Sequence, residues 1–292
     1  MYFQVVLTPT EAKKLIAKAT VKLDVVQKAL KNGIVAIHPC SGNYFVIQEL
    51  LGKIPSRPWV FGVIAPKGTC RNRQLLEHVQ KRSVEELKEP LGHTWILEKG
   101  KLGKPRILKE LLDEMGPHDV FIKGANAVDP EGNAGVLVAR SDGGTIAKVM
   151  SYGMAKGLNL VFPVGLEKLI PIPVKQAAMA AGIDKMDYST GAPVGLIPVL
   201  GTVVTEIEAI KTLVGAKATP IAAGGLQGAE GSTTMVIEGD EDQMTSAIAL
   251  VKEVKGAKLP KIDLVDCTRC QFPEIYSACT DKTWIWGSRK RV

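Results

Sequence analysis

The segment from His38 to Asn43 combines a thiol, a hydroxyl, an imidazole and a glycine directly after the apolar run 34–37. Such a run is typical of a strand buried on both faces, and the apolar spacing that follows predicts a helix. Free backbone N–H groups and the helix dipole attract anions at a helix start. We therefore expect a ligand anion to contact Cys40, Ser41, Gly42 and Asn43.

Cys40 is also a candidate nucleophile, because a helix start lowers the pKa of a thiol. His38 lies close enough in sequence to assist it, although its place beside a buried strand also suits a structural role. The alternative interpretation of the segment is a tight turn that caps the helix and holds no ligand.

A second polar segment follows the apolar run 120–122. Gly124 and Asn126 flank a small residue, which is typical of a bend-tolerant loop that faces a ligand. Asp129 and Glu131 lie in an Asp-Pro-Glu-Gly sequence that predicts a turn. They are the nearby candidates for catalytic carboxylates, although a turn predicts that they are exposed to solvent.

A third segment, 140–145, precedes another predicted helix. The guanidinium of Arg140 can bind phosphate or carboxylate with two hydrogen bonds. We therefore expect a second anion contact here, although Ser or Asp as an ordinary helix cap explains the segment equally well. The candidate binding residues are Arg140, Gly143, Gly144 and Thr145.

Three cysteines near the C-terminus, Cys267, Cys270 and Cys279, could ligate zinc or an iron–sulfur cluster. Such a site needs a fourth ligand, for which Cys40, Cys70 or a histidine is available. Partly buried thiols without metal are the alternative. The sequence requires no cofactor.

Strand-like and helix-like segments alternate along most of the chain, which predicts an α/β fold with an open, mostly parallel sheet flanked by helices. The polar segments above then lie beyond the carboxyl ends of strands, where open α/β sheets bind ligands. Strands are expected at 34–37, 59–64, 94–97, 120–122, 136–138 and 160–164, and helices at 8–32, 73–87, 106–115 and 145–156.

The rhythm changes after the proline-bearing stretch 171–193. From there, a strand at 196–204, a helix, two strands, a helix and a last strand at 262–265 follow the β-α-β-β-α-β order of a ferredoxin-like fold. We therefore expect an α/β ligand-binding domain at 1–194, a ferredoxin-like α+β domain at 195–266 and a cysteine-bearing tail at 267–292.

Composition excludes several classes of protein. Apolar residues make up 46% of the 292 residues and charged residues 23%, which is ordinary for a globular protein. The net charge of +7 is spread thinly, which disfavours nucleic acid and suits a small anionic metabolite. No apolar run reaches membrane-spanning length and no signal peptide is visible, so a cytoplasmic protein is expected.

Taken in order, residues 119–133, the Gly-Thr-Ile-Ala of 144–147, Gly157 and the apolar run 160–164 resemble a known superfamily. It includes ribose-5-phosphate isomerase, CoA transferases, methylthioribose-phosphate isomerase and the regulatory subunits of initiation factor 2B. The lactate-utilisation (LUD) proteins are similar too. The resemblance covers about residues 20–170 and implies that Ser41, Gly42, Asn43, Gly124, Asn126, Gly144 and Thr145 line one pocket.

The resemblance does not extend to the catalytic residues of these enzymes. Asn126 stands where the isomerases have an ionisable Asp, and no residue matches the glutamate nucleophile of the CoA transferases. Three hypotheses follow: an isomerase or group transferase acting on a phosphorylated or CoA-linked metabolite, a non-catalytic metabolite sensor or regulatory subunit, and a metal or redox protein using the tail cysteines. We also expect a homo-oligomer, by analogy with ferredoxin-like domains.

Overall fold

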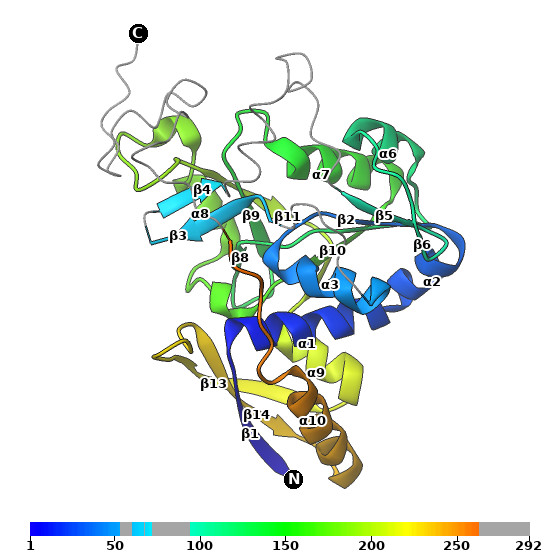
Figure 1. Ribbon diagram of the computed structural model, residues 1–292. Coiled ribbons are helices and arrows are strands. Elements are labelled where there is room, and N and C mark those ends of the chain that lie inside the picture. The colour runs from blue at the N-terminus through cyan, green and yellow to red at the C-terminus, as the bar shows by residue number, and fades with distance from the viewer. Residues whose placement is uncertain (53–59, 67, 72–93, 263–292) are drawn as a thin grey trace.

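The chain is described from a computed structural model that places residues 1–52, 60–66, 68–71 and 94–262. A six-stranded sheet forms its centre, with four neighbouring parallel strands and two antiparallel strands at one edge (Figure 1). The predicted α/β class with a mostly parallel sheet is thereby confirmed. In spatial order the strands are β12 (Thr202–Val204), β10 (Asn159–Pro163), β7 (Val120–Ile122), β2 (Ile34–Ile37), β5 (Trp95–Glu98) and β6 (Lys101–Leu102).

Successive side chains of this sheet enter two hydrophobic cores, one on each face. In β2, Val35 and Ile37 enter the first core and Ala36 enters the second, as the twofold period of a strand requires. The first core is covered by α1 (Pro9–Lys22), α2 (Asp24–Asn32), α3 (Ser41–Leu51) and α9 (Glu206–Val214). The second is covered by α6 (Leu108–Glu114) and α7 (Gly144–Lys156).

A second, antiparallel sheet packs into the core on the side of α6 and α7. Its spatial order is β11 (Gly195–Val199), β9 (Ala134–Val138) and β8 (Ala127–Val128), and α8 (Val174–Ala180) lies against it. The remaining elements here are the hairpin β3 (Gly62–Ala65) and β4 (Gly68–Arg71), and the short helices η1 (Leu166–Lys168) and η2 (Ile183–Lys185).

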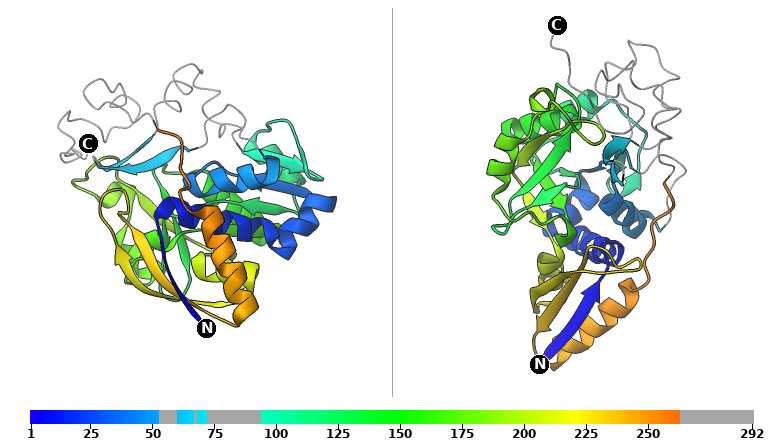
Figure 2. Two further views of the ribbon diagram at one scale, coloured as in Figure 1. Left: turned by 60° about the horizontal axis from the view of Figure 1, so that its bottom comes forward. Right: turned by 90° about the vertical axis from the view of Figure 1, so that its left-hand side faces the viewer.

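A third sheet lies at the end of the molecule that carries the N-terminus (Figure 2). It is antiparallel, in the order β1 (Tyr2–Leu7), β14 (Ser232–Glu238) and β13 (Lys217–Gly224), and α10 (Glu241–Val254) packs on it. One hydrophobic core joins it through α1 and α9 to the six-stranded sheet.

The expected ferredoxin-like domain is not confirmed in the part of the chain that the structure describes. The single strand predicted at 196–204 is wrong, because Gly201 adopts a positive φ of 156° and separates two strands. β11 pairs with β9 and β12 pairs with β10, so both belong to other sheets. The strand that completes the small sheet is β1, for which no strand was predicted.

Several other predictions need correction. The helix expected from residue 8 to 32 is two helices, α1 and α2, because Leu23 adopts an extended conformation between them. The predicted strand at 59–64 is β3, which pairs with β4 and not with the large sheet. The strand at 94–97 is β5, which runs antiparallel to β2. The helix predicted at 73–87 and the strand at 262–265 fall mainly outside the described residues.

The predicted start of α1 is confirmed. Thr8 caps the helix and Glu11 completes the capping box by accepting the Thr8 N–H at 2.9 Å. Among the described residues, none of the helices has the length and apolar character that crossing a membrane would require.

Candidate functional site

Charged and nucleophilic side chains follow the carboxyl ends of the four parallel strands. Cys40 follows β2, Lys123 follows β7, Lys168 follows β10 within η1, and Glu206 follows β12 at the start of α9. Because these strands run in one direction, their carboxyl ends lie at a single edge of the sheet, where α/β folds bind ligands. We call Lys13, Cys40, Lys123, Glu167, Lys168 and Glu206 the carboxyl-edge cluster.

The loop after β2 is fixed to the neighbouring strand by Asn43. This side chain is fully buried, and its Nδ2 donates to the carbonyl oxygens of His38 at 2.8 Å and Ile122 at 3.1 Å. Cys40 caps α3, where its Sγ accepts the N–H of Asn43 at 3.4 Å. The predicted helix start is therefore present, and Asn43 positions the loop from within the protein.

The loops after β2 and β7 meet at Cys40 and Gly124. A Cβ atom added to Gly124 would lie 2.5 Å from Cys40 Sγ, so a larger residue there would collide with the thiol. Gly42 has more room: an added Cβ would be 3.9 Å from the Pro163 carbonyl oxygen at the end of β10. The loops after three strands thus bring Cys40, Gly42 and Gly124 together, and their role in ligand binding stays a prediction.

Lys123 is the lysine of the cluster whose amine has no partner among the residues that the structure describes. Its backbone N–H donates to the Val161 carbonyl at 3.0 Å, while its Nζ makes no hydrogen bond or ion pair among the described residues. Burial among packed atoms lowers the pKa of Lys123 to about 8, and the Cys40 side chain opposes only part of that shift. The residue as a whole is nevertheless only partly buried. The amine is therefore an available donor, acid or nucleophile.

Lys168 and Lys13 are held by other residues. Lys168 Nζ donates to the Ala125 carbonyl at 2.8 Å, and burial lowers its pKa while Glu167 counteracts the shift. Lys13 Nζ pairs with Glu167 Oε1 at 2.5 Å, and both side chains are nearly buried at 11% and 12% exposure. The two contacts connect α1, η1 and the loop after β7 around the carboxyl edge.

Glu206 is a buried carboxyl group that titrates near neutral pH. Its side chain accepts the N–H of Leu166 with both oxygens, at 3.1 and 2.9 Å. Burial, followed by repulsion from Glu167, raises the pKa of Glu206 to about 7, although the backbone hydrogen bonds and Lys13 favour the charged form. Glu206 can therefore give or take a proton close to pH 7.

Several residues predicted for the site have structural partners elsewhere. Asn126 Oδ1 accepts the N–H of Leu137 at 3.0 Å and so holds β9 beside the loop after β7. Asp129 was expected to be exposed, which is wrong: it is 2% exposed, because it accepts hydrogen bonds from Asn133 and from the Val174 N–H at the start of α8. Glu131 is exposed in the turn.

The segment 140–145 forms the start of α7, whose side chains pack on the opposite face of the sheet from α3. Arg140 donates to Asp142 through Nε at 2.9 Å and Nη2 at 2.7 Å, and this contact lowers the pKa of Asp142 to about 2. Gly143 caps the helix with φ of 71°, and Gly144 N–H donates to Asp142 at 2.9 Å. The start of α7 and the start of α3, where Cys40 lies, therefore belong to opposite faces of the sheet.

The proposed metal ligands Cys267, Cys270 and Cys279 lie outside the described residues. Within residues 1–52, 60–66, 68–71 and 94–262, no three His, Cys, Asp or Glu side chains converge in a group that could hold a metal ion.

The sequence predicted only Cys40 among the members of the cluster and did not identify Lys13, Lys123, Glu167, Lys168 or Glu206. A signal was present for all of these except Lys13, since each follows a buried strand closely, as Cys40 does. The assignment of 196–204 to a second domain hid Glu206. Lys13 lies on α1 and is placed only by tertiary packing against η1.

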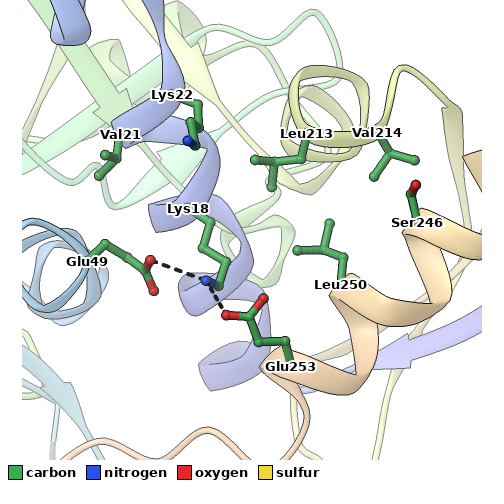
Figure 3. Close-up of a pocket in the computed structure, with 9 residues that line it drawn as sticks. All are labelled: Lys18, Val21, Lys22, Glu49, Leu213, Val214, Ser246, Leu250 and Glu253. Carbon is green, nitrogen blue, oxygen red and sulfur yellow. Dashed lines mark hydrogen bonds and ion pairs between the residues drawn. The ribbon is translucent and has the colours of Figure 1, made fainter. Parts of the chain in front are cut away.

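A separate groove lies between α1, α3, α9 and α10 (Figure 3). Lys18 crosses it and pairs with Glu49 at 3.2 Å and with Glu253 at 2.5 Å. Glu49 lies near the end of α3, whereas Cys40 caps its start, and eleven helical residues span about 16 Å. The charges of the groove are mutually compensated, so it offers weaker attraction for a charged ligand than the carboxyl-edge cluster.

No known family model, curated protein or solved structure matches this chain. The resemblance to the isomerase and CoA-transferase superfamily therefore stays a prediction, and function is argued from the carboxyl-edge cluster.

Proposed function

We propose that the protein binds a small anionic metabolite, phosphorylated or CoA-linked, at the carboxyl-edge cluster and acts on it by isomerisation or group transfer. The observation that carries this proposal is the amine of Lys123 beside the start of α3, which makes no hydrogen bond or ion pair within the described part of the chain.

Two kinds of donor favour an anion at this edge. The first N–H groups of a helix have no intrahelical acceptor, and the amides of Ser41 and Gly42 make no hydrogen bond among the described residues. Lys123 adds an amine that can donate a hydrogen bond to the ligand beside these amides. An anion here would satisfy donors that have no acceptor in the described part of the protein.

Turnover is favoured by the titration behaviour of the cluster. Lys123 has a pKa of about 8 and Glu206 a pKa of about 7, so both exchange protons near neutral pH. Groups with pKa values near the working pH are effective general acids and bases, which isomerisation and group transfer both require.

A regulatory role is the second candidate, and one contact favours it. The loop between β13 and β14 reaches the cluster, where a Cβ added to Gly231 would lie 3.6 Å from Glu167 Cβ and 3.2 Å from Pro9. Ligand binding near Glu167 could therefore be transmitted to the small sheet without turnover.

The small sheet also supports the proposed homo-oligomer. β13 is its edge strand, and most of its side chains are exposed, including Ile221 at 55%. Light scattering of the purified chain tests this proposal directly, because a monomer at all concentrations contradicts it.

A thermal-shift screen tests the proposed function. Sugar phosphates, nucleotides, CoA thioesters and small carboxylates are compared for the wild type, Lys123→Gln and the matched control Lys28→Gln, which alters an exposed lysine on α2. Ligand that binds only the folded state raises the melting temperature. We expect one class to stabilise the wild type and the control but not Lys123→Gln.

Nuclear magnetic resonance of the stabilising ligand then separates the two candidates. Conversion of the ligand identifies an enzyme, and unchanged ligand identifies a sensor. Absence of any shift with all four classes contradicts the proposed anion site.

A further inference from the structure

We infer that the ε-amine of Lys123 forms a Schiff base with the aldehyde or ketone group of a phosphorylated metabolite. This inference rests on the proposed anion site and deepens it, because it specifies a carbonyl group in the ligand and a covalent step. The start of α3 takes the phosphate and Lys123 takes the carbonyl carbon.

The position of Lys123 in the sheet supports this role. Lys123 directly follows β7, which lies between β2 and β10. The Lys123 N–H is bonded to Val161 on one side, and the His38 N–H is bonded to the Ile122 carbonyl at 2.9 Å on the other. The base of the side chain is therefore held on a rigid element, which is what a covalent catalytic residue requires.

The partners of the other lysines single out Lys123. Lys13 is paired with Glu167, and Lys168 is bonded to the Ala125 carbonyl, so both amines are occupied. Lys123 Nζ has no such contact among the described residues. An amine engaged in an ion pair is protonated and cannot attack a carbonyl, whereas an unpaired amine in a desolvated place can.

The chemistry balances without an added oxidant or reductant. The lone pair of the neutral Lys123 amine attacks the carbonyl carbon and gives a carbinolamine. The hydroxyl group then leaves with a proton from the nitrogen as one water molecule, and a C=N bond replaces the C=O bond. The lowered pKa of about 8 supports the first step, because it raises the neutral fraction at pH 7 on the order of a hundredfold over an ordinary lysine.

The start of α3 sets the orientation of such a ligand. Cys40 Sγ touches the backbone of Gly124, the residue after Lys123, so the helix start and the base of the lysine side chain are adjacent. A phosphate on the open amides of Ser41 and Gly42 would place the rest of a small molecule near Lys123. A phosphate group on an aldehyde is therefore expected to increase the labelling of Lys123 by that aldehyde.

Reductive trapping tests the inference with glycolaldehyde phosphate as the probe and glycolaldehyde as its phosphate-free control. The full chain is incubated with a limiting amount of each, sodium borohydride reduces any imine to a stable amine, and peptide mass spectrometry locates the adduct. We expect the phosphate probe to label Lys123 at least about tenfold more than the exposed Lys28, given the larger neutral fraction. Glycolaldehyde, which lacks the phosphate group, should show a much smaller excess of Lys123 labelling over Lys28 labelling.

The variants Lys123→Arg and Lys28→Arg keep the positive charge and complete the test. Lys123→Arg should lose the adduct and keep stabilisation by phosphorylated ligands, whereas Lys28→Arg should keep both. Labelling spread over exposed lysines without enrichment at Lys123 overturns the Schiff base. If phosphorylated ligands still stabilise that protein, the proposed anion site survives, and if they do not, both proposals fail.

Discussion

The sulfur of Cys40 lies against the backbone of Gly124, where an added Cβ would be only 2.5 Å from Sγ. This contact joins the loops that follow β2 and β7, two adjacent parallel strands. It explains why a glycine is needed directly after Lys123, and it makes the positions of the thiol and the lysine interdependent.

Replacing Gly124 with alanine should therefore destabilise the fold through overpacking, by about 1–3 kcal/mol. Cys40→Ala removes the obstructing sulfur, so the double variant should recover part of that loss. Urea unfolding of the wild type, both single variants and the double variant measures the coupling. Coupling of roughly 0.5 kcal/mol or more is expected between residues in contact, and strict additivity contradicts the packing described.

Gly116→Ala is the matched control for that series. An added Cβ at Gly116 meets no atom within 4 Å, so this variant should cost little and should show no coupling to Cys40→Ala.

Asn43→Ala should lower both stability and ligand affinity. The substitution leaves the His38 carbonyl without its buried donor, whereas the Ile122 carbonyl keeps the N–H of His38, so the expected loss is about 1–3 kcal/mol. Because Asn43 holds the loop that bears Cys40, binding of a phosphorylated ligand should weaken as well. Calorimetry measures the stability and a titration measures the affinity.

Asn159→Ala provides the comparison for Asn43. Asn159 Nδ2 also donates to two carbonyls, those of Pro117 at 2.8 Å and Asp119 at 3.0 Å, but it lies at the opposite end of the strands. The Asn159→Ala variant should be less stable than the wild type but should bind the ligand with unchanged affinity. Equal loss of affinity in both variants would mean that Asn43 acts on the fold alone.

Glu206→Gln should change how stability depends on pH. The folded-state pKa of Glu206, about 7, is above its ordinary value of 4.5, so the folded state binds more protons between these values. The stability contributed by this protonation is fully present below pH 4.5 and is lost as pH rises through 7. Relative to the variant, the wild type should lose roughly 3 kcal/mol across that window.

Urea unfolding of the wild type and Glu206→Gln at pH values from 4 to 8 measures this difference, in which groups common to both proteins cancel. Glu131→Gln removes an exposed carboxylate from a turn and serves as the control for charge removal. A difference between wild type and Glu206→Gln that is constant over the range contradicts the buried, protonated carboxyl group.

Much of the fold could be predicted from local patterns. The run 34–37 is apolar throughout because both faces of β2 are covered. The capping box of Thr8 and Glu11 indicates the start of α1, because the first N–H groups of a helix need side-chain acceptors. Sheet membership could not be predicted in the same way. β11 and β12 are five and three residues long, and only pairing with β9 and β10 determines where each belongs.

The candidate site was predicted in part for a similar reason. The sequence placed Cys40 and Gly124 beyond strand ends, and strand direction brought them together. Asn126 and Asp129 were also candidates, yet their side chains accept hydrogen bonds from backbone N–H groups that no local pattern identifies in advance. The position of Lys13 in the cluster and the raised pKa of Glu206 could not be predicted, because the first depends on packing against Glu167 and the second on burial and repulsion from Glu167.

Competitive acylation of lysines by acetic anhydride tests the central claim, that Lys123 is an open, ligand-binding amine at the carboxyl edge. Its rate is measured by mass spectrometry over a pH series, with and without a phosphorylated ligand. We predict that Lys123 reaches half its limiting rate near pH 8, well below ordinary lysines, and that the ligand protects it while Lys28 reacts unchanged. The account is contradicted if Lys123 titrates like the exposed lysines and if none of the phosphorylated ligands slows its acylation.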